Sequence, residues 1–340
     1  MKKLIILFLL TFLLFGCEKS EKYVDSSFFA MDTVIDIRIS QGELDEASII
    51  AECEGLIADI ESVISKSAEG SDTYIANTEI DHLLDFSPIF EELIKLSSEY
   101  SALTGGAFDI TVGTLKELWE KCAEEGREPT AAELESSLEK VGFEGLTLGD
   151  GILEKSFKET KLDFGAVGKG YAAQKVCRLL EERGVSGAIL SFGGNVALVG
   201  AKRNGEPYRV GVKDPENTDD VIGYLLLEGG YVSVSGDYER HIEIGDKIYN
   251  HIIDPTTGYP VSNGIHSVVV VSDDGALADA LSTALFVMGI DAAKELYSSG
   301  KCDFEAIFVA DDGIFATAGL DGIFTPKKGM KITFFDKQVE

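Results

Sequence analysis

The order of hydrophobic patterns along the chain is the feature that most limits how it can fold. Helical spacing dominates the first part, where apolar residues recur every three to four positions over 43–64 and again over 88–106. Beyond residue 145, strand patterns such as those over 187–194 and 208–214 follow one another with few helices between them. Strands that rarely alternate with helices do not form a βαβ series, so the order predicts an α+β fold: one large unit with a helix-rich N-terminal part and mixed or antiparallel sheets.

Individual segments support this expectation. Residues 33–40, TVIDIRIS, alternate apolar and polar side chains as a half-buried strand does. Thr130 followed by Glu133 forms a capping box, which predicts that a helix starts at residue 131. Helices are also expected at about 276–288 and 291–299. Further strands are expected at 231–237, 241–253, 266–272, 304–311 and 330–336.

The first residues indicate export. Lys2 and Lys3 precede an apolar run that ends at Cys17. This run is too short for a stable membrane span. The stretch LLFGC resembles a bacterial lipobox, in which Cys17 would become the lipidated N-terminus; a plain signal peptide or an uncleaved anchor is the alternative. We expect a signal peptide at 1–16, a lipidated N-terminus and polar tether at 17–27, and one domain at 28–340. The protein would then sit outside the cytoplasmic membrane, held by lipid.

The net charge of −29 limits the partners of the protein. So acidic a surface repels nucleic acid and anionic lipid, and a phosphorylated ligand would need a few placed cations, backbone amides or a metal. Four cysteines follow Cys17, and no two of them form a Cys-x-x-Cys pair. We expect buried free thiols rather than a metal-thiolate site.

The stretch 161–176, KLDFGAVGKGYAAQKV, resembles a phosphate loop at first sight. It has several glycines and Lys169, followed by a helical pattern. A P-loop, however, places Ser or Thr directly after the lysine, and here Gly170 occupies that position. The sequence of the loop alone does not identify its ligand.

A pair of oxygen donors further along suggests a metal. Asp279 and Thr283 lie four residues apart, on one face of an otherwise apolar helical pattern. A carboxylate on such a face is costly unless a cation or donors meet it, and two oxygen ligands suit Mg²⁺ better than Zn²⁺. The alternatives are an exposed helix face or a satisfied capping pair.

Taken together and in order, several motifs resemble the ApbE family of FAD:protein FMN transferases. They are MDT, GAFDITVG, LDFGAVGKGYA, SFGGN, SGDYER, HIIDPTTGYP and ADALSTA, which span about residues 28–289. The combination of HIIDPTTG with ADALSTA downstream is the most specific part. The resemblance implies an ApbE-like fold, FAD as substrate, Mg²⁺ as cofactor and an FMN transferase domain at 28–340.

The resemblance also assigns roles to single residues. It implies that Asp279, Thr283 and the Ala166 carbonyl bind Mg²⁺, and that Lys169 supplies a second cation. Lys169 as a solvated surface charge and Met31 as a core strand residue are the alternatives for those two positions. The residues implied to contact the flavin nucleotide are Met31, Ala107, Phe108, Asp109, Asp163, Lys169 and Ile253.

His251, in NHIIDP, is the candidate proton acceptor. Histidine can accept a hydroxyl proton near neutral pH, and positioning of the ligand or a structural hydrogen bond is the equal alternative. His82, His241 and His266 are expected to be ordinary surface or strand residues. One departure concerns the aromatic residue that family members often place after the first long helix: here Ser67 stands at that position and Tyr74 follows later.

The activity implied is Mg²⁺-dependent transfer of FMN from FAD to a threonine hydroxyl of an exported acceptor protein, with release of AMP. A membrane electron-transfer subunit would be one such acceptor. Two rival functions stay open. One is an FAD pyrophosphatase that yields FMN and AMP, and the other is a lipoprotein that binds FAD without chemistry.

Overall fold

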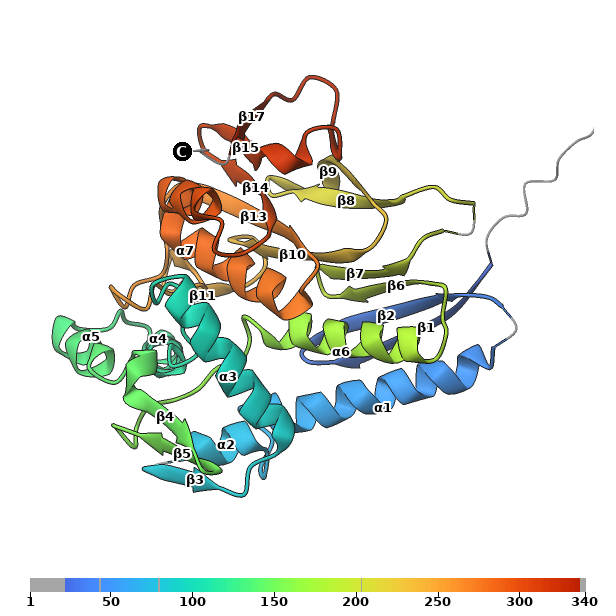
Figure 1. Cartoon of the computed structure of the whole chain (residues 1–340). Helices are drawn as coiled ribbons and strands as arrows, with labels where there is room; N and C mark the ends of the chain where they lie inside the picture. The colour runs from blue at the N-terminus through green and yellow to red at the C-terminus, as the bar shows by residue number, and fades with distance from the viewer. Residues whose placement is uncertain (1–21, 43, 79, 203, 337–340) are drawn as a thin grey trace, which may run out of the picture.

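The computed structural model describes residues 22–336 except 43, 79 and 203. The expected signal peptide at 1–16 and Cys17 lie outside the described residues. The chain forms an α+β fold with helices on one face of a large sheet, as the sequence predicts (Figure 1).

The central sheet has nine strands, and its neighbours are antiparallel except for the last pair, β15 and β17. Strand β2 shows why these segments form strands: Ile35, Ile37 and Ile39 are fully buried, while the residues between them are exposed. From one edge to the other, the order is β1 (Tyr23–Ala30), β2 (Thr33–Ser40), β6 (Gly187–Phe192), β7 (Asn195–Gly200), β10 (Gly230–Gly236), β13 (Ile265–Ser272), β14 (Glu305–Ala310), β15 (Gly313–Thr317) and β17 (Ile332–Phe335).

Three helices cover one face of this sheet: α1 (Glu46–Ile64), α6 (Gly168–Glu182) and α7 (Gly275–Ser299) (Figure 1). Helix α1 buries Ile57 and Ile60, which belong to the same hydrophobic cluster as the isoleucines of β2. Helix α7 is long and apolar enough to cross a membrane, but its apolar residues are largely buried against β10, β13 and α6. It is the core helix of this domain.

The opposite face of the central strands packs on a small three-stranded sheet. A cluster that includes Leu225, Val232 and Ile307 joins the two sheets. The small sheet consists of β16 (Phe324–Pro326), β9 (Asn217–Leu227) and β8 (Tyr208–Asp214). The middle of the molecule is therefore a three-layer arrangement of helices, sheet and sheet.

A second group of elements lies beside the helical layer at the lower left of Figure 1. It contains the remaining sheet of three short strands, several helices and, toward α4, a two-stranded hairpin. These elements are α2 (Asp72–Ala76), β3 (His82–Leu84), α3 (Pro88–Leu103), α4 (Gly113–Glu124), α5 (Ala131–Leu138), β4 (Leu146–Gly149), β5 (Ile152–Lys155), β11 (His241–Ile244) and β12 (Lys247–Asn250). Two single 3₁₀ turns lie at Phe143–Gly145 and Ala318–Leu320.

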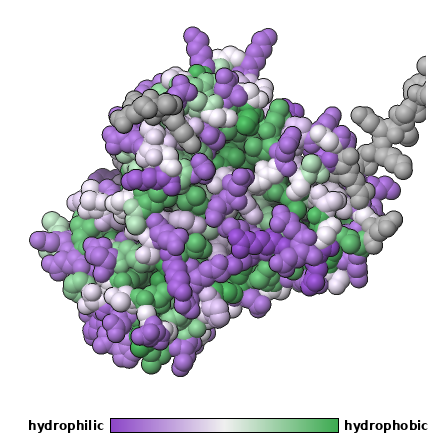
Figure 2. Space-filling view, viewed as in Figure 1, coloured by the Kyte–Doolittle hydropathy of each residue, from purple (hydrophilic) through white to green (hydrophobic). Residues whose placement is uncertain are grey.

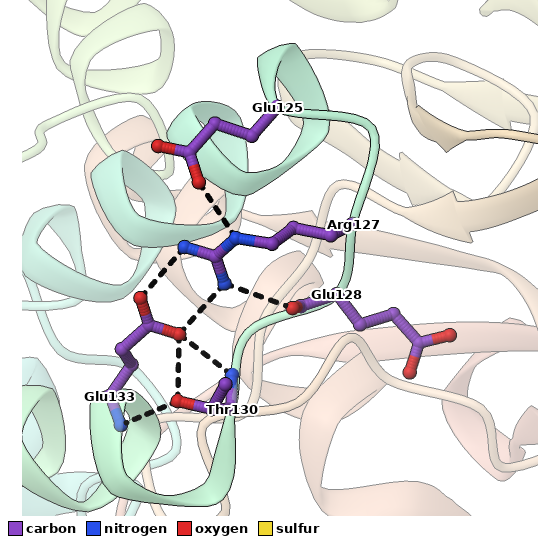
Figure 3. Close-up of polar contacts among 5 residues, drawn as sticks. All are labelled: Glu125, Arg127, Glu128, Thr130 and Glu133. Atoms are coloured by element: carbon purple, nitrogen blue, oxygen red, sulfur yellow. Dashed lines mark hydrogen bonds and ion pairs between the residues drawn. The ribbon is translucent and has the colours of Figure 1, made fainter.

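The predicted capping box is confirmed. Thr130 accepts from the Glu133 amide, and the Glu133 carboxylate accepts from the Thr130 amide (Figure 3). Arg127 adds two hydrogen bonds to the same carboxylate. Helix α5 thus starts at residue 131 because its first amides are satisfied locally.

The expected domain boundary at residue 28 is wrong within the described residues. Strand β1 begins at Tyr23 and pairs with β2 along its whole length, so the domain includes at least residues 23–27 of the expected tether. The backbone pairing of β1 decides this, because Asp25, Ser26 and Ser27 put polar residues on both faces of an edge strand and resemble a linker in sequence.

Other expectations are confirmed. The expected helices at 276–288 and 291–299 are present as α7, which kinks at Gly289, a residue with a non-helical φ of 80°. Cys53, Cys122 and Cys177 are free and buried, and Cys302 is half-buried. On the face shown in Figure 2, hydrophilic residues cover much of the surface and hydrophobic residues appear in patches between them.

Candidate functional site

One cavity of about 490 Å³ brings together residues from distant parts of the chain. Its volume lies in the usual range of small-molecule sites. It lies where the β1–β2 turn, the first turns of α6 and α7, and the segment after β12 meet. All eleven predicted site residues line it: Met31, Ala107, Phe108, Asp109, Asp163, Ala166, Lys169, His251, Ile253, Asp279 and Thr283.

Asp279 lies at the buried end of this cavity and is only 3% exposed. Its Oδ2 accepts from the Gly170 amide and its Oδ1 from Asn195 Nδ2, each at 2.8 Å. Two neutral donors therefore fix the carboxylate, and the described residues provide no ion pair for it. The position on an apolar helix face expected from the sequence is confirmed, and the donors come from residues far away in the chain.

Gly170 explains why this loop differs from a P-loop. A Cβ at this position would lie 2.1 Å from the Gly275 carbonyl oxygen and 2.5 Å from Asp279 Cβ. The first turns of α6 and α7 cross so closely that only glycine fits. A Ser or Thr at this position would not fit, and glycine there allows the Gly170 amide to donate to Asp279.

Thr283 lies one turn further along α7 and is half-buried. Its Oγ1 lies 3.1 Å from Ser235 Oγ, which in turn lies 2.9 Å from Ser282 Oγ. Ala166, which precedes α6, lines the same cavity. A carboxylate, a hydroxyl and a backbone carbonyl are oxygen donors of the kind that Mg²⁺ takes, so this set fits the implied ion. Among the described residues, no three His, Cys, Asp or Glu side chains lie close enough together to hold a metal ion.

Asp163 belongs to a charged group on another wall. Its Oδ1 lies 3.2 Å from Lys116 Nζ, and its Oδ2 lies 3.7 Å from Lys66 Nζ. Desolvation alone would raise its pKa, but the two lysines and the Gly165 amide outweigh it and bring the pKa to about 2. Asp163 is therefore ionised throughout the neutral range and holds two cations at the cavity.

The segment 107–109 forms the wall beside Asp163. The Asp163 amide donates to the Ile110 carbonyl, which joins the two segments. Phe108 is buried against Tyr100, with ring centroids 6.1 Å apart. Desolvation raises the pKa of Asp109, whose Oδ1 accepts from the amide and the hydroxyl of Thr111.

Met31 occupies a turn, so the alternative of a core strand residue is wrong. Met31 and Asp32 connect β1 and β2 with φ values of 52° and 59°, in the left-handed region. The Met31 amide donates to Glu61 Oε1 at 2.8 Å. A methionine held in this unfavourable conformation at a cavity wall is the kind of strain found at functional sites.

His251 lines the cavity, and one hydrogen bond fixes the orientation of its ring. Its Nδ1 lies 3.1 Å from the Arg240 carbonyl oxygen, which can only accept. The proton is therefore on Nδ1 and the Nε2 lone pair is free to accept. Desolvation, assisted by Lys116, lowers the pKa of His251 to about 4, so the ring is neutral at pH 7.

Several cavity residues were missed by sequence reasoning. Lys116 belongs to α4, a helix that the sequence analysis did not predict. His241 was expected to be an ordinary residue but lines the cavity. Glu239 lines it too; desolvation raises its pKa, Asp279 adds to this and Lys169 opposes it. Ser67 lines the cavity, while Tyr74 lies on α2 outside the lining. The remaining expected residues, His82 and His266, lie outside it.

Comparisons with known proteins identify the family of this chain. The family model described as the ApbE family matches residues 31–308. The FAD:protein FMN transferase of Vibrio cholerae is 30% identical over 88% of this chain and 92% of its own length. The crystal structure of the ApbE protein of Thermotoga maritima is 30% identical, with a TM-score of 0.82 over 89% of this chain and 99% of that one. The flavin transferase ApbE structure from Vibrio cholerae is 26% identical, with a TM-score of 0.77 over the same shares.

The similarity in sequence and in α+β fold to these relatives shows that the chain is a flavin-transferase-like protein. The chain belongs to the ApbE family.

Proposed function

We propose that this protein is an Mg²⁺-dependent transferase that moves FMN from FAD to a threonine hydroxyl of an exported acceptor protein and releases AMP. The observation that carries the proposal is the convergence of all eleven predicted residues on one cavity. Curated relatives named FAD:protein FMN transferase support the same activity.

The transfer makes and breaks one bond at phosphorus. The threonine oxygen bonds to the FMN phosphorus, the bridging P–O bond to AMP breaks, and AMP leaves with the bridging oxygen. The threonine proton goes to a base. His251 supplies a free Nε2 lone pair for that proton or positions the hydroxyl by accepting a hydrogen bond from it. Its neutral state at pH 7 suits both roles.

Charge at the phosphates must be offset in this acidic protein. Mg²⁺, held by Asp279, Thr283 and the Ala166 carbonyl, would stabilise the negative charge of the pyrophosphate and of the transferred phosphoryl group. Lys169 lines the same cavity and adds a cation. The pair of Lys116 and Lys66 is already engaged by Asp163 and holds the wall where the nucleotide would lie.

The proposal includes a location. Cys17 carries lipid on the outer side of the cytoplasmic membrane, and β1 begins at Tyr23, so the tether is much shorter than expected. The cavity therefore stays close to acceptors in the membrane. Mass spectrometry of the mature protein from cells tests this, and an unmodified N-terminus would contradict it.

One assay tests the activity against its rivals. The mature protein is incubated with FAD, Mg²⁺ and an exported flavoprotein that carries a candidate target threonine. A gain of one FMN mass on the acceptor together with AMP supports transfer, and a Thr→Ala variant of the acceptor should gain nothing. AMP without that gain supports a pyrophosphatase, and unchanged bound FAD supports storage.

A further inference from the structure

Three hydroxyl groups beside Asp279 form a chain whose hydrogens can be assigned. Ser282 Oγ lies 2.8 Å from the Asp279 backbone carbonyl oxygen, which has no hydrogen to give, so Ser282 donates. Ser235 Oγ lies 2.9 Å from Ser282 Oγ. Since the only hydroxyl hydrogen of Ser282 is used, Ser235 donates to Ser282.

The same count fixes the third hydroxyl. Thr283 Oγ1 lies 3.1 Å from Ser235 Oγ, and Ser235 already donates its hydroxyl hydrogen to Ser282. Thr283 must therefore donate to Ser235. The hydroxyl hydrogens point in one direction, from Thr283 through Ser235 to Ser282 and on to the carbonyl of Asp279.

This direction decides what Thr283 can bind. Its hydrogen points away, into the protein, and both lone pairs of Oγ1 are left for the cavity that Thr283 lines. Such a hydroxyl can coordinate a cation but cannot donate to a phosphate oxygen. The Asp279 carboxylate likewise offers only lone pairs, because each of its oxygens accepts one hydrogen bond, from Gly170 and from Asn195.

We propose that Ser235 and Ser282 are positioning residues that hold the Thr283 hydroxyl with its lone pairs toward the cavity and thereby prepare this end of the cavity to coordinate a divalent cation. The inference rests on the proposed function, which places Mg²⁺ there. Ser235 comes from β10 and Ser282 from α7, so the chain also ties the strand to the helix that carries the two side-chain ligands. Ser282 is fully buried and Ser235 is 8% exposed, so water does not readily replace either hydroxyl.

Without Ser235, the Thr283 hydroxyl loses its acceptor. It would then rotate toward another acceptor, such as a carbonyl of the preceding helical turn, and its lone pairs would turn with it. Loss of one such hydrogen bond corresponds to a change in affinity of about three- to tenfold. The affinity for the metal should fall while the nucleotide contacts on other walls stay unchanged.

The test measures metal binding directly. Mn²⁺ is titrated into the mature protein and followed by electron paramagnetic resonance, with and without ADP, whose pyrophosphate matches that of FAD. Ser235→Ala and, as an independent variant on the other element, Ser282→Ala should each weaken Mn²⁺ binding by about three- to tenfold. Ser235→Thr keeps the hydroxyl on a strand that accepts β-branched residues and should retain the wild-type affinity. ADP binding without metal should not change.

A matched control and a double variant separate positioning from general damage. Ser97 is a fully buried serine whose hydroxyl has no partner among the described residues, so Ser97→Ala should leave Mn²⁺ binding unchanged. In a Thr283→Ala background, Ser235→Ala should have no further effect on Mn²⁺ affinity, because its target is gone. Wild-type affinity in both serine variants, or full additivity with Thr283→Ala, would overturn the inference. Absence of Mn²⁺ binding in the wild type would instead count against the proposed function.

Discussion

Two carboxylates in this protein are each fixed by several hydrogen bonds, and they differ in where their partners come from. Glu133 takes its partners from Thr130 and Arg127, within six residues, and it lies at the surface (Figure 3). Asp279 takes its partners from Gly170 and Asn195, which are 109 and 84 residues away, and it is buried.

The two carboxylates also differ in whether a positive charge lies beside them. The guanidinium of Arg127, with help from the Thr130 amide and hydroxyl, lowers the pKa of Glu133 to about 2. Asp279 meets only neutral donors. A local cluster with its own counter-charge stabilises one helix end, whereas a buried carboxylate without one is suited to receive a cation. The difference separates structural from functional polar groups in this fold.

Removal of the buried carboxylate should have the largest effect. We expect Asp279→Ala to slow Mg²⁺-dependent release of AMP from FAD by about 10²- to 10³-fold, because the main charge that holds the metal is lost. AMP is measured by chromatography, and circular dichroism checks folding. Glu133→Ala is the matched control and should retain the wild-type rate. Normal AMP release by the Asp279 variant would refute the contrast.

His251 provides the next largest effect. His251→Gln should lower FMN transfer by about 10²-fold, since the glutamine cannot take up the threonine proton. In the wild type, the neutral ring is needed, and its pKa is about 4. The contribution of His251 to kcat/KM should therefore be constant from pH 8 to 5 and fall as the pH drops through about 4. A decline centred near 6.5, the ordinary pKa of histidine, would contradict the lowered pKa of His251.

Asp163 is intermediate between the two clusters, because it is largely buried yet paired with lysines. Its folded pKa of about 2 lies below the ordinary 3.8, so its contribution to stability is complete above pH 3.8 and is lost as the pH falls toward 2. The shift corresponds to about 2 kcal/mol. Asp163→Asn should lower the free energy of unfolding in urea by roughly that amount at pH 7 and by less at pH 3. An equal loss at both pH values would mean that the charge plays no part.

The same division explains how far the sequence could predict the structure. The capping box, strand β2 and the amphipathic helix α1 depend on spacing within one segment, and the structure confirms them. Strand β1 and helix α4 were missed. Consecutive polar residues in an edge strand resemble a linker, and the motif GAFDITVG gives no indication that helix α4 begins at its last residue, Gly113.

The site was predictable only in part. The apolar helix face around Asp279 indicated a ligand, and the family resemblance supplied the other residues. Asn195 and Ser235 lie in the motifs SFGGN and SGDYER, but the resemblance assigned no role to either, and Lys116 lies outside the motifs. The roles of all three arise from contacts across many residues. Gly170 was visible as a departure from the P-loop, but its reason, the crossing with Gly275, requires the packing of α6 on α7.

The smallest effect should come from the local cluster. Thr130→Ala removes the N-cap of α5 and should lower the free energy of unfolding by about 1 kcal/mol. The rate of AMP release should stay unchanged, since Thr130 does not line the cavity. Thr130→Ser is the control, because it keeps the capping oxygen and should retain nearly all of the stability. If Thr130→Ala slowed AMP release as strongly as it destabilised α5, the two clusters would be coupled. The division between a structural and a functional carboxylate would then fail.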